Sequence, residues 1–282
     1  MNRTARRKFT SGLVVALCGA AVVLALVPLF FVFAYVISKG FSSLNWDFFT
    51  KAPKPVGEAG GGMANAMIGT LILIGIASAV AVPVGVIAGV YLSEYGKKKF
   101  ATLVRFTADV LNGVPSIVIG IFAYGLAVLP VKHFSALAGG LALGFMMIPI
   151  ITRTTEELLN LVPGSLREGA LALGATRARA AFSVMVPAAL PGIMTGILVA
   201  LARIAGETAP LLFTAFNNRF FTTRLDQPIS SLPVQIYTYA VAPYEDWHRQ
   251  AWAGALVLLA FVFTFSVLAR VVTRRLERMH RT

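Results

Sequence analysis

An arginine and a glutamate inside a long apolar stretch, Arg203 and Glu207, are the residues best suited to handle an anion. Charged side chains within membrane-spanning segments are rare, face protein or water, and mark transport pathways by default. The two residues are four positions apart, so on a helix they would share a face and could pair. We therefore expect a cationic gate for an anion, in which Glu207 holds or releases Arg203. A structural ion pair that locks two helices together is the alternative.

A proline shortly after Glu207 adds irregular backbone to this candidate site. Pro210 has no amide hydrogen, and its ring crowds the carbonyl of Gly206 four residues earlier. We expect the helix to kink there and to leave that carbonyl free beside the charges. Irregular backbone at membrane depth is tolerated only where protein buries it or where it lines a cavity. Gly206 and Pro210 are therefore assigned to the same translocation pathway.

A second candidate site is the charged segment 153–187. A proline and a glycine at 163–164 break the chain, and Ser165 and Glu168 have the spacing of a capping box at the start of a helix. Gly174 suits the left-handed backbone position that ends a helix. Short helices that carry charged and apolar side chains between membrane spans predict a docking surface for a soluble partner. The alternatives are an ordinary connecting loop and a DNA-binding helix-turn-helix, which the position between two membrane spans disfavours.

The composition places both candidate sites in a membrane protein. Of the 282 residues, 57% are hydrophobic and 13% are charged, whereas soluble proteins have about 25% charged residues. A membrane-spanning helix needs roughly 20 mostly apolar residues. Uncharged runs therefore predict an all-α polytopic protein, a single transmembrane domain over 1–282 with six spans. These spans are expected near residues 13–37, 66–92, 110–130, 134–152, 188–215 and 250–270.

The distribution of basic residues predicts the orientation of the chain in the membrane. An even number of spans puts both termini on one side, and that side carries most of the 25 Lys and Arg residues. The positive-inside rule then makes both termini and segment 153–187 cytoplasmic, and segment 217–249 periplasmic. The net charge of +13 is thus interpreted as a topology signal and not as the sign of a nucleic-acid partner.

The sequence offers no nucleotide, metal or cofactor site of its own. A phosphate-binding P-loop needs G-x-x-x-x-G-K-[ST], and the Gly-Lys pair at 96–97 lacks the earlier glycine and is followed by lysine. The lone Cys18 excludes a disulfide framework, and the three histidines share no metal-ligand spacing. We expect no enzymatic activity from this chain alone, no cofactor and no metal. The energy for transport must then come from a separate ATPase.

The spacing of residues in the cytoplasmic segment matches a known pattern. Glu168, Ala170, Gly174 and Pro187 stand where the pattern E-A-A, three residues, G, nine residues, I-x-L-P requires them, and Gly169 replaces the first Ala. This stretch resembles the EAA loop of ABC-importer permeases, in which short coupling helices insert into a groove of the ATPase subunit. The resemblance implies ATPase docking through Glu168, Gly169, Ala170 and Gly174.

Further stretches resemble one branch of these permeases. They are GGGMANAMIGT at 60–70, VPSIVIG at 114–120, residues 153–157, GETAPLLFTA at 206–215 and LPVQIY at 232–237. Together they resemble the PstA-type phosphate permease family from about residue 60 to the C-terminus. The resemblance implies that Arg153 and Arg203 act in phosphate transport, with Glu207 as a partner. Arginine suits this work because its planar fork matches phosphate oxygens and keeps its charge.

The same resemblance implies a set of partners and a location. The partners are a second, PstC-type permease subunit, two PstB-type ATPase subunits and a periplasmic PstS-type phosphate-binding protein. The expected location is the bacterial inner (cytoplasmic) membrane, within the lipid bilayer. Two alternatives remain open: an ABC permease for another oxyanion or a phosphate ester, and a secondary anion transporter, which would need an ion-coupling site of its own.

Overall fold

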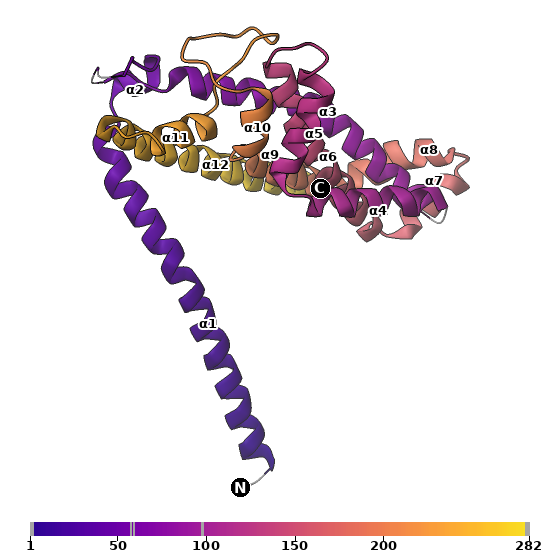
Figure 1. Ribbon diagram of the computed structural model, residues 1–282. Helices are drawn as coiled ribbons and strands as arrows, with labels where there is room; N and C mark the ends of the chain where they lie inside the picture. Colours follow the sequence, from indigo (N-terminus) through magenta and orange to yellow (C-terminus); the bar gives the residue numbers. More distant parts are fainter. Residues whose placement is uncertain (1–2, 57, 59, 97–98, 280–282) are drawn as a thin grey trace.

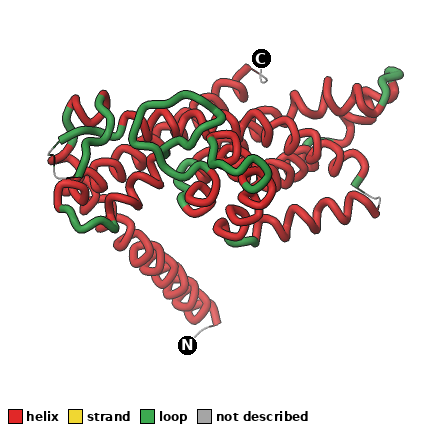
Figure 2. Tube along the Cα trace, turned by 45° about the horizontal axis from the view of Figure 1, so that its top comes forward, coloured by secondary structure: helices red, strands yellow, loops and turns green. Residues whose placement is uncertain are grey.

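The computed structural model describes residues 3–56, 58, 60–96 and 99–279, which form helices joined by loops (Figure 1; Figure 2). In chain order the elements are α1 (Arg3–Gly40), η1 (Phe41–Ser43), α2 (Trp46–Thr50), α3 (Ala64–Tyr95), α4 (Lys99–Gly113), α5 (Ser116–Ala123), η2 (Tyr124–Val128), α6 (Ala136–Leu161), α7 (Gly164–Ala172), α8 (Arg177–Ala180), η3 (Ala181–Met185), α9 (Val186–Ile204), α10 (Ala209–Thr214), α11 (Leu232–Ala240) and α12 (Glu245–Met279). The expectation of an all-α polytopic membrane protein is confirmed.

Five helical stretches are long and apolar enough to cross a membrane. They are Arg7–Ser43, Ala64–Tyr95, Ala136–Leu161, Arg177–Ile204 and Glu245–Leu268. A sixth candidate is the pair Lys99–Gly113 and Ser116–Val128, whose two parts are bent by 108°. The structure thus differs from the single membrane-spanning helix expected near residues 110–130, because α4 ends at Gly113 and α5 starts after Pro115. Proline disfavours helical backbone in the residue before it, so the chain turns at this point.

The span that was expected over residues 188–215 begins earlier, at Arg177. Helix α8, the π-helical turn η3 and helix α9 follow one another without a break from Arg177 to Ile204. We call this continuous helical element, Arg177–Ile204, the rod. Within it, the amide of Val186 donates to the carbonyl of Ala181, five residues back. Pro187 stands in the first turn of α9, where a missing amide hydrogen is tolerated. The C-terminal part of segment 153–187, from Arg177 on, and the span that follows it therefore form one continuous helical element.

Helices α3 and α6 pack along each other to form the centre of the molecule. The contact is close because glycines of α3 face α6: a Cβ on Gly89 would lie 2.5 Å from the Cβ of Thr155, and one on Gly85 would lie 2.7 Å from the Cβ of Ile151. Small residues let helix backbones approach in this way within membranes. The pair forms a rigid support on which the neighbouring helices α4 and α9 are placed.

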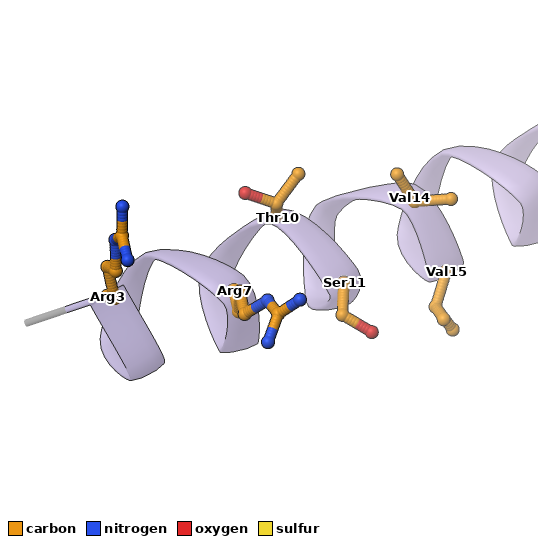
Figure 3. A pocket seen from close by; sticks show the side chains of 6 residues that line it. All are labelled: Arg3, Arg7, Thr10, Ser11, Val14 and Val15. Carbon is orange, nitrogen blue, oxygen red and sulfur yellow. The ribbon is translucent and has the colours of Figure 1, made fainter.

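Helix α1 leaves the rest of the molecule and extends as a long single helix (Figure 1). It touches the body at its C-terminal end, where the Tyr35 and Trp252 rings lie 5.1 Å apart. In the most apolar 18-residue stretch of this helix, no residue is buried within the molecule. At its far end, two basic side chains and two hydroxyls lie along the helix before the apolar stretch begins (Figure 3): Arg3, Arg7, Thr10 and Ser11. This change from charged to apolar residues suits a helix that enters a bilayer.

Candidate functional site

Arg203 lies in the last turn of α9, immediately before a break in the helix. Helix α9 ends at Ile204 and α10 begins at Ala209. The Arg203 side chain is exposed, and its cationic group lies at the helix C-terminus, where the helix dipole favours positive charge. Among the described residues, no ion pair or side-chain hydrogen bond involves Arg203. Its guanidinium is therefore available to an external anion.

The structure replaces the expected kink at Pro210 with a complete break. Pro210 stands in the first turn of α10, where no amide hydrogen is needed. The chain leaves the helix at Gly206 and Glu207, whose amides donate to the carbonyls of Arg203 and Ile204 at 3.4 and 3.1 Å. These hydrogen bonds span three residues instead of four, and the helix then ends. The four-residue spacing of Arg203 and Glu207 therefore no longer places them on one helix face. The pairing that the spacing allowed is absent within the described part of the chain, and half-buried Glu207 stands apart from exposed Arg203.

Helix α5 supports this break from the side. A Cβ on Gly120 would lie 2.6 Å from the Cα of Pro210, so the backbones of α5 and α10 are in direct contact. The carbonyl of Pro210 is satisfied by the Thr214 hydroxyl at 2.7 Å, a buried contact. The VPSIVIG stretch therefore positions the residues that follow Arg203. The sequence alone linked Gly120 to Pro210 only through the family resemblance.

Arg153 lies in a different place, within a network of carboxylates on α6 and α4. Its Nη1 lies 2.7 Å from Oε2 of Glu156, and its Nε lies 2.9 Å from Oδ1 of Asp109. Arg105 lies on the other side of Glu156, with its Nε 2.5 Å from Oε1. Glu156 is only 3% exposed, so two arginines hold one buried carboxylate. Arg105 also donates to the carbonyls of Gly96 and Leu92 at the end of α3, which ties α3, α4 and α6 together.

The structure does not bring Arg153 and Arg203 into contact. Thr154, the neighbour of Arg153, packs against Gly196 of α9, and Arg203 stands seven residues beyond Gly196. At 1.5 Å per residue this places Arg203 roughly 10 Å farther along the helix. The resemblance had assigned both arginines to one pathway; here one is free and the other is bound to two carboxylates.

Helix α7 presents most of the predicted ATPase-docking residues on its surface. Glu168, Gly169 and Gly174 are exposed and Ala170 is half-buried, while Leu173 is 91% exposed. The capping box expected at Ser165 and Glu168 is wrong: α7 starts at Gly164 after Pro163, and no side-chain cap is formed.

The end of α7 follows the prediction for Gly174. Its φ is +84°, the left-handed region that favours glycine. The amide of Gly174 donates to the carbonyl of Leu171 at 2.9 Å, and the amide of Ala175 donates to Ala170 at 3.1 Å. This is a Schellman motif, which closes the helix end. The turn places Leu173 directly after the end of α7, before Thr176 caps α8.

An ion pair that the sequence did not reveal fixes α7 to the membrane helices. Nη2 of Arg167 lies 2.9 Å from Oε1 of Glu94 at the end of α3. Glu94 and Arg167 are far apart in the sequence, as are Arg105 and Glu156, and no spacing rule links either pair. The i, i+3 spacing of Arg153 and Glu156 is the one local signal that pointed to this network.

The segment between α10 and α12 forms the opposite side of the molecule. The amide of Leu232 donates to Oγ1 of Thr70 at 2.8 Å, which holds the start of α11 on α3. The Tyr239 and Trp247 rings stack at 4.5 Å, and burial raises the pKa of Tyr239 above its usual value. Phe220 remains largely exposed in the preceding loop. Among the described residues, no group of three or more His, Cys, Asp or Glu side chains is placed to hold a metal ion.

Known proteins resemble this chain in sequence and in fold. Residues 81–278 match the family described as binding-protein-dependent transport system inner membrane component. The chain is 42% identical to the phosphate transport system permease protein PstA of Yersinia pestis, covering 96% of this chain and 92% of that protein. It is 48% identical to the protein of the same name from Xylella fastidiosa strain Temecula1, covering 85% and 84%.

A solved structure shares the fold at low sequence identity. A chain of the MetNI methionine ABC transporter superposes with a TM-score of 0.60 at 20% identity, covering 76% of this chain and 94% of that one. The family match extends over most of the helices that hold Arg153, α7 and Arg203 in place. This chain therefore belongs to the family of inner-membrane components of binding-protein-dependent transport systems.

Proposed function

We propose that this chain is the PstA-type permease subunit of an ATP-driven importer of inorganic phosphate. The observation that carries the proposal is identity of 42–48% to proteins named phosphate transport system permease PstA, over most of both chains. The free guanidinium of Arg203 at a helix break supplies a group that suits phosphate oxygens. The chain forms half of the pathway, and ATP is hydrolysed in separate subunits.

We call α7 and the turn after it, residues 164–176, the docking segment. The helical rod from Arg177 to Ile204 connects this docking segment to Arg203. It spans 28 residues, or roughly 40 Å, and it starts directly after the α7 turn. When the ATPase pair closes, it moves α7, and the rod transmits that movement to the break at 205–208. Arg203 then passes from outward to inward exposure and carries its phosphate contact with it. Gly206 and Pro210 supply the break, and Glu207 competes for Arg203 during part of the cycle.

Arg153 acts in this account by positioning helices. Its two carboxylate partners hold α4 against α6 near the docking segment. Movement of α7 reaches this network because Glu94, which binds Arg167, lies on α3 close to the residues that Arg105 caps. We infer that Arg153 contacts phosphate only if Asp109 releases it.

The proposed assembly rests on the family resemblance, and the exposed surfaces supply room for its contacts. The docking residues Glu168, Gly169, Ala170 and Gly174 contact one of two PstB-type ATPase subunits. The unburied face of α1 and the exposed faces of the other candidate spans meet lipid and a second, PstC-type permease. The loop with Phe220 receives a periplasmic PstS-type phosphate-binding protein. Both termini are cytoplasmic in this arrangement, and the protein resides in the bacterial inner membrane.

Uptake of labelled phosphate tests the proposed function. Cells that lack their own PstA-type permease receive this chain together with the other subunits of its transporter. We expect phosphate uptake that excess sulfate or molybdate does not suppress. Suppression by either oxyanion, or absence of uptake by a complex shown to be assembled, would favour a permease for another substrate.

A further inference from the structure

A basic cavity lies where the ends of α3, α4, α6, α7 and α8 meet. Its volume is about 520 Å³, and arginines from three separate helices line it: Arg105, Arg167 and Arg177. In Figure 1, α4, α7 and α8 gather at one end of the molecule. This cavity is separate from the break beside Arg203. Of α7 it is lined by Arg167 and Leu171, and none of the proposed docking residues Glu168, Gly169, Ala170 and Gly174 lines it.

The charges around this cavity favour an anion. Glu94 neutralises Arg167 and Glu156 neutralises Arg105, whereas Arg177 has no ion pair among the described residues. Helix α4 begins at Lys99, close to the lining residue Gly96. The N-terminus of this 15-residue helix adds a partial positive charge. The lining therefore keeps a net positive potential after its internal pairs are formed.

Hydrogen-bond donors at this cavity lack acceptors. Nε of Arg167 is buried, and no acceptor lies within reach of it in the described part of the chain. Asn160 is exposed; its Oδ1 accepts from the Ser93 hydroxyl at 3.1 Å, and its amide nitrogen donates to no described residue. A buried donor such as Nε of Arg167 is normally satisfied within the protein. Oxygen atoms of a bound anion would supply the missing acceptors.

An apolar hollow adjoins the basic cavity. It has a volume of about 190 Å³ and shares Glu94, Tyr95 and Arg177 with the basic cavity. Its remaining lining is mostly apolar and comes from the end of α3 and from the rod: Ile87, Val90, Tyr91, Ala178, Ala181 and Phe182. A charged pocket beside an apolar hollow at the end of a membrane span has the form of a phospholipid site.

We propose that this cavity binds the phosphate group of an anionic phospholipid, whose acyl chain lies along the adjoining hollow. The phosphate oxygens would accept from Arg167, Arg177 and Asn160. Because these residues come from α7, α8 and α6, the lipid would fasten the docking segment to the membrane helices. Free phosphate would make the same polar contacts, but it has no apolar part that could occupy the hollow.

Lipid retention by the complete transporter tests this proposal. The complex with its ATPase is purified from membranes that contain phosphatidylglycerol and phosphatidylcholine, and the retained lipids are identified by native mass spectrometry. We expect the wild-type complex to retain phosphatidylglycerol in preference. Arg177→Gln should reduce that retention roughly tenfold, the effect of losing one charge-assisted contact. Arg177→Lys keeps the charge and should restore most of it.

Arg179→Gln is the matched control, because Arg179 lies on the same helix, is exposed and does not line the cavity. It should leave lipid retention unchanged. Equal loss in both glutamine variants, or no preference for phosphatidylglycerol in the wild type, would overturn the proposal. So would displacement of the lipid by millimolar inorganic phosphate, which would assign the cavity to the free ion. The readout does not depend on phosphate uptake, so it can fail or succeed independently of the proposed function.

Discussion

Nε of Arg105 lies 2.5 Å from Oε1 of Glu156, a carboxylate that is 3% exposed and that Arg153 binds from the other side. This contact joins α4 to α6 across 51 positions of the sequence. It lies close to the docking segment and away from the break at Arg203. Arg105, Arg153 and Glu156 thus hold helices together, whereas Arg203 has no ion pair in the described part of the chain.

Replacement of Glu156 should destabilise the assembled transporter. Glu156→Gln leaves two partly buried guanidinium groups without their shared carboxylate, and breaking a buried pair costs about 3 kcal/mol. Asp109→Asn is the control, because the Asp109 side chain is 56% exposed and such pairs contribute less than about 1 kcal/mol. Thermal unfolding of the purified complex measures both. Equal unfolding midpoints for the two variants would contradict the conclusion that Glu156 holds α4 against α6.

Contact between α5 and α10 should tolerate no side chain at Gly120. A methyl group there would lie 2.6 Å from the Cα of Pro210, and overpacking of this kind costs about 1–3 kcal/mol. Gly120→Ala should lower both stability and phosphate uptake. Gly125→Ala is the matched control, because nothing lies within 4 Å of a Cβ at that position. If uptake is the same in both variants, α5 does not position the break.

Charge reversal on α7 should separate the permease from its ATPase. Glu168 is exposed, so Glu168→Lys should leave the fold intact and remove a contact to the partner. Co-purification of the ATPase measures the effect. Glu58→Lys is the matched control, because Glu58 is also exposed and lies in the loop before α3, outside the docking residues. Retention of the ATPase by Glu168→Lys would place the docking surface elsewhere.

Glu207 should matter less than Arg203 for uptake. In this structure the two residues form no ion pair within the described chain, so Glu207→Gln leaves the guanidinium of Arg203 in place for phosphate. We expect a modest reduction for Glu207→Gln and a severe one for Arg203→Gln. A structural ion pair would instead make the two single variants and the double variant equally damaging, because any one change breaks the same contact.

The sequence predicted the parts of the fold that depend on local rules. Long uncharged runs located the candidate spans, and Gly174 was correctly assigned to a left-handed helix end. Pro210 predicted that the helix is disturbed but not how far, because both a kink and a complete break accommodate a residue without an amide hydrogen. Ser165 failed as a cap because Pro163 starts the helix earlier than the capping-box spacing requires.

The long-range ion pairs could not have been predicted from one sequence. Arg105 and Glu156, or Arg167 and Glu94, are brought together by the packing of α3, α4, α6 and α7. No periodicity links residues that are more than fifty positions apart. The resemblance identified Arg153 as important, but only the structure shows that its charge is already neutralised by carboxylates.

Phosphate uptake by the Arg203→Gln variant tests the central claim most directly. The measurement is the initial rate of labelled phosphate uptake by cells in which the variant is shown to assemble with its ATPase. A free arginine that contacts phosphate during transit predicts a loss of roughly tenfold or more, because one charge-assisted contact is removed. Arg203→Lys should keep part of the rate. Near-normal uptake by assembled Arg203→Gln would contradict the account.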